Sequence, residues 1–279
     1  MARLGKTGTF RVLKEVDFGV YLDGGDFGEV LMPSRYVPEG VRPGDEVEGF
    51  LYLDSLGRPV VTTLRPLAEA GDFALLEVVQ VTSVGAFLAW GIAKDLLLPF
   101  SEQKRDPKVG DRMLVYVYED EASRRVVATQ KWERFLNREP FPFPVGAEVE
   151  LLIAGATPLG YKAVINGRWL GLLYKNEVFS PVRVGDRVKG YVKVLRPDGK
   201  IDLSPRRAGY GAVAEESDRL AERIQAAGGF LPVTDKTPAD DIYALLQMSK
   251  KTYKKAVGDL YRRRLITLEP DGLRWKGNR

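Results

Sequence analysis

Apolar and polar residues alternate with a period of two in short runs over the first 207 residues, and glycine turns separate these runs. Such alternation is typical of a β-strand that is buried on one side only. In the run near residue 190, Val188, Val192 and Val194 are expected on the core face. Lys189, Tyr191 and Lys193 are expected on the open face. The pattern predicts short strands that each turn one face to a core.

The strands belong to an internal repeat. A turn signature with a Gly-Asp pair occurs three times, at 41–47, 109–113 and 182–188, and an aromatic residue stands six positions after each of these glycines. The three aromatic residues are Phe50, Tyr116 and Tyr191. Each copy also contains a glycine turn, an apolar strand and a final strand. In total, each copy has room for five short strands in roughly 65 residues. This spacing predicts three tandem five-stranded barrels of the OB type.

After residue 207 the period changes from two to 3.6, which indicates helices. Helices are expected over 215–226, 238–247 and 249–264, and two strands over 265–268 and 273–275, joined by an Asp-Gly hairpin turn. The order of helix, helix, turn, helix and hairpin resembles a winged helix, which is a variant of the helix-turn-helix.

Polar residues at the expected helix starts predict how these helices begin. Thr237 is expected to cap the second helix with Pro238 at its first helical position, and Ser249 is expected to cap the third helix. The apolar face of the third helix would consist of Tyr253, Val257, Leu260 and Tyr261.

Together these patterns predict a mainly β chain with a C-terminal α+β domain, divided into five segments. The three barrels are expected at 1–66, 67–131 and 145–207, a linker at 132–144, and the winged helix at 208–279. The first half of the linker favours a short helix. Its second half alternates proline and phenylalanine, so it is expected to be an extended strap packed on a neighbouring barrel.

The sequence contains neither histidine nor cysteine, which excludes Ser-His-Asp and Cys-His catalysis and a conventional zinc site. No cofactor or metal is therefore expected, and the protein is not expected to be an enzyme. An RNA-processing enzyme that uses carboxylates is an alternative, disfavoured because no tight acidic cluster is evident. Since no apolar run approaches the roughly 20 residues of a membrane span and the N-terminus lacks a signal-peptide core, a cytoplasmic protein without membrane contact is expected.

Positive charge is concentrated in the second half of the chain. Segments 1–66 and 67–131 each carry 8 Lys/Arg against 10 Asp/Glu, whereas 145–207 carries 11 against 6 and 208–279 carries 13 against 10. This asymmetry indicates that the second half binds a polyanion. Ordinary solubilising charge is the alternative explanation.

The repeated motifs resemble those of a known RNA-binding domain. Each copy has a glycine turn beside an aromatic or apolar strand, a Leu-Leu or Val-Leu strand and a Gly-Asp turn, and the third copy ends in Leu203-Ser204-Pro205-Arg206. This order resembles the S1-type domain over about residues 1–207. The histidine that often follows the Gly-Leu-Leu strand in S1 domains is Pro33, Pro99 or Tyr174 here. Only Tyr174 retains a ring that can stack on a base.

The complete order of three S1-type modules and a winged helix resembles the conserved virulence factor B family of bacteria, whose members are also called YitL-like proteins. This resemblance spans nearly the whole chain. It implies an RNA-binding protein with a role in post-transcriptional control of gene expression.

The third copy interleaves aromatic rings with cations, which is the pattern that single-stranded RNA requires. Bases stack on rings with about 1–3 kcal/mol each, and lysines and arginines neutralise the phosphates. The candidates in this copy are Tyr161, Lys162, Tyr174, Lys175, Lys189, Tyr191, Lys193, Arg206 and Arg207. Weaker candidates in the first two copies are Phe18, Tyr21 and Phe87. By contrast, packing rather than RNA contact is expected for Phe50, Tyr116, Tyr118, Trp132 and Trp169.

The third helix of the tail is strongly basic. Its candidate nucleic-acid contacts are Lys250, Lys251, Lys254, Lys255 and Arg262. Four of these cations lie in the first half of the helix, where the helix dipole disfavours them, so a binding role is favoured over a solvated face. A winged helix used only for protein contact is the remaining alternative.

The leading hypothesis is a non-enzymatic bacterial RNA-binding protein that holds single strands with the third barrel and the winged helix. The alternative is a DNA-binding regulator, with the winged helix in a major groove and the barrels as a protein-interaction platform. In either case the first two barrels are candidates for contact with a protein partner.

Overall fold

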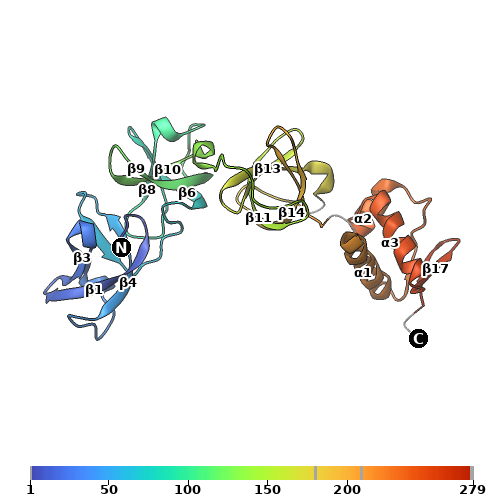
Figure 1. Cartoon of the computed structure of the whole chain (residues 1–279), viewed down its shortest axis with the longest axis horizontal. Coiled ribbons are helices and arrows are strands. Elements are labelled where there is room, and N and C mark those ends of the chain that lie inside the picture. The colour runs from blue at the N-terminus through green and yellow to red at the C-terminus, as the bar shows by residue number, and fades with distance from the viewer. Residues whose placement is uncertain (1, 179–180, 208–209, 277–279) are drawn as a thin grey trace. The chain divides into compact units, whose positions relative to one another are not determined.

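The computed structural model describes residues 2–178, 181–207 and 210–276, and it confirms the predicted fold class. Three five-stranded β-sheets are followed by three helices with a small sheet (Figure 1). The chain forms two compact units, Met1–Asn137 and Arg138–Arg279. The finer division into five segments stays a prediction.

The first barrel is closed, with the strand order β1-β2-β3-β5-β4. Its strands are β1 (Thr7–Val16), β2 (Gly19–Asp23), β3 (Glu29–Pro33), β4 (Glu46–Leu53) and β5 (Pro59–Thr62). A bulge between Val12 and Lys14 bends β1, so that one long strand pairs with both β2 and β4. Gly19 is required where β2 meets β3, because a Cβ there would lie 2.1 Å from the carbonyl oxygen of Met32.

The second barrel has the same succession of strands in the order β10-β9-β6-β7-β8. Its strands are β6 (Phe73–Thr82), β7 (Gly85–Leu88), β8 (Leu96–Pro99), β9 (Arg112–Asp120) and β10 (Arg125–Thr129). The structure describes every residue of these five strands. Strands β8 and β10 are neighbours, but no ladder of backbone hydrogen bonds joins them. The sheet is therefore barrel-like but open at one seam.

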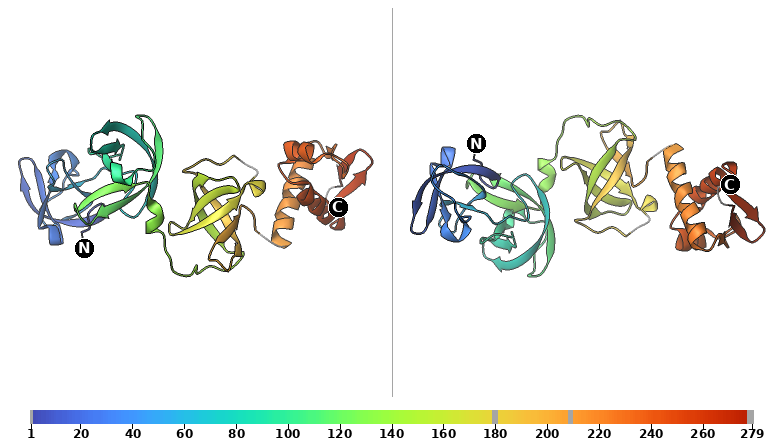
Figure 2. Two further views of the ribbon diagram at one scale, coloured as in Figure 1. Left: turned by 90° about the horizontal axis from the view of Figure 1, so that it is seen from above. Right: turned by 90° about the horizontal axis from the view of Figure 1, so that it is seen from below.

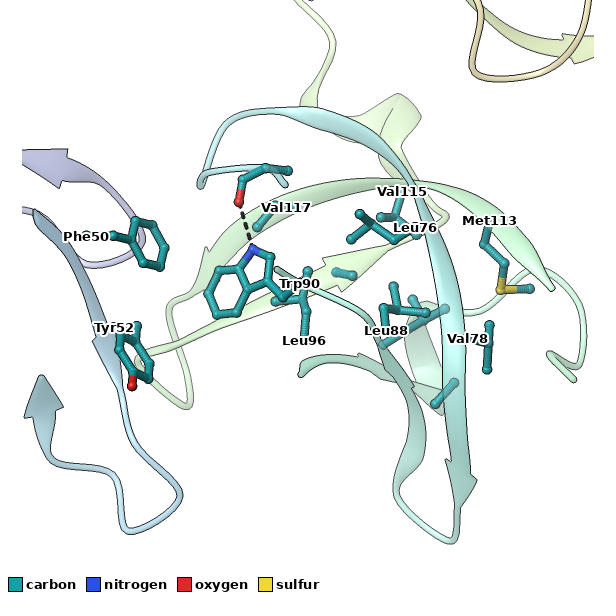
Figure 3. Packing of buried hydrophobic residues seen from close by; sticks show 14 of the residues in the cluster. Phe50, Tyr52, Leu76, Val78, Leu88, Trp90, Leu96, Met113, Val115 and Val117 are labelled. Carbon is teal, nitrogen blue, oxygen red and sulfur yellow. Dashed lines mark hydrogen bonds between the residues drawn. The ribbon is translucent and has the colours of Figure 1, made fainter. Parts of the chain in front are cut away.

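The first two barrels share a core (Figure 3). Phe50 meets the Trp90 ring edge to face, with centroids 5.3 Å apart, and Trp90 Nε1 donates a hydrogen bond of 2.7 Å to the carbonyl oxygen of Ala68. Lys94 Nζ donates to the carbonyl oxygens of Leu53 and Asp54 at 2.6 and 2.9 Å. The prediction that Phe50 packs is confirmed, because its side chain is 1% exposed.

The start of the predicted linker packs on the second barrel. It forms a 3-10 turn, Trp132–Phe135, whose Phe135 ring stacks on Tyr116 at a centroid distance of 4.6 Å. Tyr118 also contacts Phe135, and Trp132 is buried against Phe73. The predicted packing of Tyr116, Tyr118 and Trp132 is confirmed.

The third barrel, coloured mainly yellow in Figure 2, is closed. Its strand order is β11-β12-β13-β15-β14. Its strands are β11 (Glu148–Ala156), β12 (Gly160–Ile165), β13 (Trp169–Tyr174), β14 (Arg187–Leu195) and β15 (Ile201–Ser204). Val192 is fully buried, as expected. The expectation for Val194 is wrong, because a bulge between Val192 and Val194 breaks the alternation and leaves Val194 41% exposed.

The Pro/Phe part of the linker packs on this barrel. Phe141 and Phe143 each meet Trp169 edge to face, with centroids 5.5 and 6.1 Å apart. The predicted strap and the predicted packing of Trp169 are therefore confirmed.

The C-terminal domain has the order of elements predicted for a winged helix. Its elements are α1 (Tyr210–Ala226), β16 (Phe230–Leu231), α2 (Ala239–Leu246), α3 (Lys250–Arg262), β17 (Ile266–Glu269) and β18 (Gly272–Trp275). Helix α1 begins five residues before its predicted start, and β16, which pairs with β18, is too short to leave a periodic signal. None of the helices in the described part of the chain is long and apolar enough to cross a membrane.

The helix caps differ in part from the prediction. Ser249 caps α3 as expected, since its Oγ accepts a hydrogen bond of 3.1 Å from the Thr252 amide. The prediction for Thr237 is wrong: Pro238 occupies the N-cap position of α2, and Thr237 Oγ1 instead accepts from the Thr234 amide. Tyr261 is 55% exposed, so it does not belong to the apolar face of α3.

Candidate nucleic-acid interface

A groove with a volume of about 550 Å³ runs across the outside of the third barrel. It lies over β12 and β13, between the 157–159 loop that joins β11 to β12 and the 196–200 loop that joins β14 to β15. In OB folds this is where oligonucleotides bind, because the second and third strands form the floor and these two loops form the walls. The groove is therefore the candidate interface of this barrel.

The groove combines an apolar floor with a cationic rim. Leu159 is 65% exposed, and Leu170 and Leu172 are half-buried in the floor. The cations that line the groove are Lys162, Arg196 and Lys200. Such a surface can pack against the flat faces of bases and place positive charge beside their phosphates.

One polar network stands in the groove. Arg196 Nε donates to both carboxylate oxygens of Asp202 at 3.0 Å, and Nη2 donates to Asp202 Oδ2 at 2.8 Å and to the Tyr174 hydroxyl at 2.5 Å. The Tyr174 hydroxyl donates in turn to Asp202 Oδ1 at 3.3 Å. The hydrogen bond to Asp202 raises the pKa of Arg196 above its ordinary value. The guanidinium is thus held in one orientation.

The cations predicted on β14 have carboxylate partners. Lys189 Nζ lies 2.8 Å from Glu148 Oε1, the Tyr191 hydroxyl donates to Glu148 Oε2 at 3.2 Å, and Lys193 forms an ion pair with Glu177. The hydrogen bond from Lys189 lowers the pKa of Glu148. Exposed ion pairs of this kind contribute little to stability, but they neutralise the charge of both lysines.

The structure brings only some of the predicted residues of this barrel together. Lys162 and Tyr174 line the groove. Tyr161 lies on the other face of β12, where it pairs in register with the buried Leu173 and packs against the core. Lys175 is exposed in the 3-10 turn that follows β13.

The two arginines at the end of the third barrel differ in their surroundings. Arg206 is held by Glu216 at 2.6 Å and donates to the carbonyl oxygen of Gln247 at 3.4 Å. Arg207 is exposed. Arg206 therefore stabilises the start of the C-terminal domain, and only Arg207 presents its charge to solvent.

Sequence reasoning missed most of the groove residues, among them Leu159, Arg196, Lys200 and Asp202. A signal was available in the repeat itself. The loop that opens with Arg196 in the third barrel opens with Asp54 in the first and Asp120 in the second, so the charge is reversed at one equivalent position.

Helix α3 carries a second group of cations. The spacing of Lys251, Lys254 and Lys255 places them on one face; all three are exposed and none forms an ion pair with another described residue. Lys250 instead donates to the carbonyl oxygen of Thr237 at 2.8 Å, and Arg262 lies 3.7 Å from Asp259. Three of the five predicted cations thus present unneutralised charge.

The weaker candidates in the first two barrels are aromatic rings, and Lys14, which lies over one of them, is paired with Glu29. Phe18 is 56% exposed and meets Tyr21 edge to face at 6.4 Å, and Lys14 Nζ lies 4.8 Å from the centroid of the Tyr21 ring. Phe87 is half-buried opposite Leu97.

No cluster of three or more acidic, histidine or cysteine side chains suited to a metal occurs in the described residues.

Comparison with family models confirms the resemblance seen in the sequence. The S1-domain model matches residues 4–64 and 70–131, and the model of the CvfB-like winged helix domain matches residues 218–274. The third barrel has the strand order of the first but lies outside the matched ranges. Since S1 and winged-helix domains bind nucleic acids, the domain content is that of a nucleic-acid-binding protein.

Similar proteins are found in bacteria. The chain is 26% identical over 278 residues to the uncharacterized protein YitL of Bacillus subtilis, covering 92% of this chain and 89% of that one. It is 22% identical over 237 residues to conserved virulence factor B of Staphylococcus saprophyticus, covering 81% and 78%. A crystal structure of a multidomain protein with nucleic acid binding domains from Streptococcus pneumoniae aligns over 98% of both chains, with 21% identity and a TM-score of 0.42.

Proposed function

This chain is a relative of YitL and conserved virulence factor B, built from S1 domains and a CvfB-like winged helix, and on that premise we propose that it binds single-stranded RNA through its third barrel and winged helix. It does so without catalysing a reaction. Its role is that of a cytoplasmic bacterial regulator that acts after transcription.

One observation carries the proposal: the groove of the third barrel is cationic at positions where the other barrels are not. Lys162 occupies the strand position of Tyr21 in the first barrel, and Arg196 occupies the loop position of Asp54. A single strand laid along the groove would place its phosphates beside these cations and its bases on the leucine floor. Segment 145–207 also has five more Lys/Arg than Asp/Glu, which likewise favours the binding of a polyanion.

Helix α3 supports a second contact on the same chain. Its three exposed lysines attract phosphates irrespective of base sequence. Two weak sites on one chain reinforce each other through effective concentration, so the pair binds RNA more tightly than either site. The proposal is thus a bipartite one, with the groove and α3 contacting one RNA.

Binding of a labelled oligouridylate, measured by fluorescence anisotropy across a salt series, tests the proposal. The full chain, residues 1–137 and residues 138–279 are compared. Binding confined to the full chain and to 138–279, with a steep salt dependence, is expected. Equal binding by 1–137 would show that exposed rings matter more than charge, and an absence of binding by the full chain would refute the proposal.

A DNA-binding regulator is the second candidate, because α3 is the second helix of the turn, the helix that helix-turn-helix domains place in a major groove, and it carries three exposed lysines. Competition between duplex DNA and oligouridylate for the full chain separates the two. A duplex that displaces RNA at physiological salt would favour DNA. Magnesium-dependent shortening of the RNA during the assay would instead point to an enzyme.

A further inference from the structure

Three positions in the groove change together in the third barrel. Tyr174 lies at the end of β13, where it pairs with Gly160 of β12. Arg196 is the first residue of the β14–β15 loop, and Asp202 of β15 pairs with Val194 of β14. In the first and second barrels, the position of Tyr174 is occupied by Pro33 and Pro99, that of Arg196 by Asp54 and Asp120, and that of Asp202 by Val60 and Val127. The hydrogen-bonded network is therefore particular to the third barrel.

A stable barrel does not require this network. Val60 and Val127 are 7% and 4% exposed, so an apolar residue fills the position in both other barrels. Asp202 is 8% exposed and places a carboxylate there instead. A buried carboxylate paired with an arginine is commonly no more stabilising than a well-packed apolar residue. The network therefore calls for an explanation other than stability.

The network fixes the guanidinium and leaves part of it available. Of its five N–H groups, the one on Nε and the two on Nη2 are directed to Asp202 and Tyr174. The two on Nη1 have no partner among the described residues, and the side chain is 42% exposed at the groove. A guanidinium held in this way presents two N–H donors on Nη1, each of which can donate to a phosphate oxygen.

We infer that Arg196 forms a phosphate-binding site for the RNA backbone in the groove, and that Asp202 and Tyr174 are positioning residues for its guanidinium. The inference rests on the proposed function and specifies one contact of it. Lys162 and Lys200 line the same groove, so the neighbouring phosphates also meet positive charge.

This assignment makes a prediction opposite to that of simple electrostatics. If the groove attracted RNA only through its net charge, removal of the Asp202 carboxylate would strengthen binding, because one negative charge would be lost beside the phosphates. If Asp202 positions Arg196, its removal weakens binding, since the guanidinium then samples many orientations. The sign of the effect distinguishes the two.

The experiment measures the dissociation constant of a labelled oligouridylate for the full chain and its Asp202→Asn, Tyr174→Phe and Arg196→Lys variants across a salt series. Asp202→Asn and Arg196→Lys are each expected to weaken binding by about tenfold, and Tyr174→Phe by about threefold. The slope with salt is expected to stay unchanged in Arg196→Lys, because the charge is retained.

Glu150→Gln is the matched control, because it removes a carboxylate from the same barrel that is paired with Arg187 outside the network. Its binding is expected to be equal or tighter. Thermal melts identify variants that fail to fold, and Tyr174→Phe, which loses only a hydroxyl group, keeps the inference testable if Asp202→Asn unfolds. Unchanged or tighter binding by folded Asp202→Asn, or by Tyr174→Phe, would overturn the inference while leaving the proposed function intact. No binding by the unaltered chain would overturn both.

Discussion

The first and third barrels have one fold but use the same positions differently. Six residues after the turn glycine, Phe50 is buried against Trp90 of the second barrel, whereas Tyr191 is half-buried with its hydroxyl on Glu148. At the loop that closes the barrel, Asp54 of the first barrel corresponds to Arg196 of the third. The closed strand order is retained in both. The closed barrel thus accepts a packed ring or a partly exposed one, and an acid or an arginine, at the same positions without altering its strand order.

The largest expected effect tests the packing side of this comparison. Phe50→Ala removes a ring from the core shared by the first two barrels, so it is expected to reduce the free energy of unfolding of residues 1–137 by about 3–5 kcal/mol. Chemical denaturation monitored by Trp fluorescence measures the change. The control is Phe18→Ala, whose ring is 56% exposed and which should cost less than about 1 kcal/mol. Equal costs for the two variants would mean that the shared core contributes little.

The second prediction reverses the charge that separates the two barrels. Arg196→Asp gives the third barrel the residue type of the first, and it is expected to weaken oligouridylate binding by about thirtyfold through lost attraction and added repulsion. The reciprocal Asp54→Arg change in the first barrel is expected to leave binding within about twofold, since Tyr21 occupies the strand position of Lys162 in that barrel. A strong gain from Asp54→Arg would show that charge alone converts a barrel into an RNA site.

The sequence was sufficient for the repeat and the strands, because each depends on residues close together in the chain. It also indicated packing for Phe50, although the partner of that ring, Trp90, lies in the next barrel. Three features depended on distant residues and were missed. The exposure of Val194 follows from a bulge, which no alternation records. The contact of Arg196 with Asp202 and Tyr174 forms only when β15 pairs with β13 and β14 to close the barrel. Carboxylate partners of Lys189 and Lys193 likewise come from strands or turns far away in the sequence.

The third prediction compares neutralised with unneutralised cations in the second half of the chain. Lys251→Ala with Lys254→Ala removes two lysines that lack ion-pair partners among the described residues, so the slope of log affinity against log salt is expected to fall by about 1.4 for a single strand. Arg263→Ala is the control, because Arg263 is paired with Asp218 at 3.0 Å. Anisotropy titrations at several salt concentrations provide the slopes. Equal slope changes in both variants would show that intramolecular pairing does not determine which cations meet phosphate.

The smallest effect concerns the aromatic position with which the comparison began. Tyr191→Ala is expected to weaken oligouridylate binding by about fivefold, through the loss of one stacking surface, and to cost less than about 1 kcal/mol of stability. Val192→Ala, one residue away but fully buried, is expected to destabilise the barrel by about 2 kcal/mol and to leave the affinity of the folded protein unchanged. Melting temperatures and dissociation constants are measured for both. If Tyr191→Ala instead unfolds the barrel with no loss of affinity per folded molecule, Tyr191 is a packing residue like Phe50, and the groove alone separates the third barrel from the first.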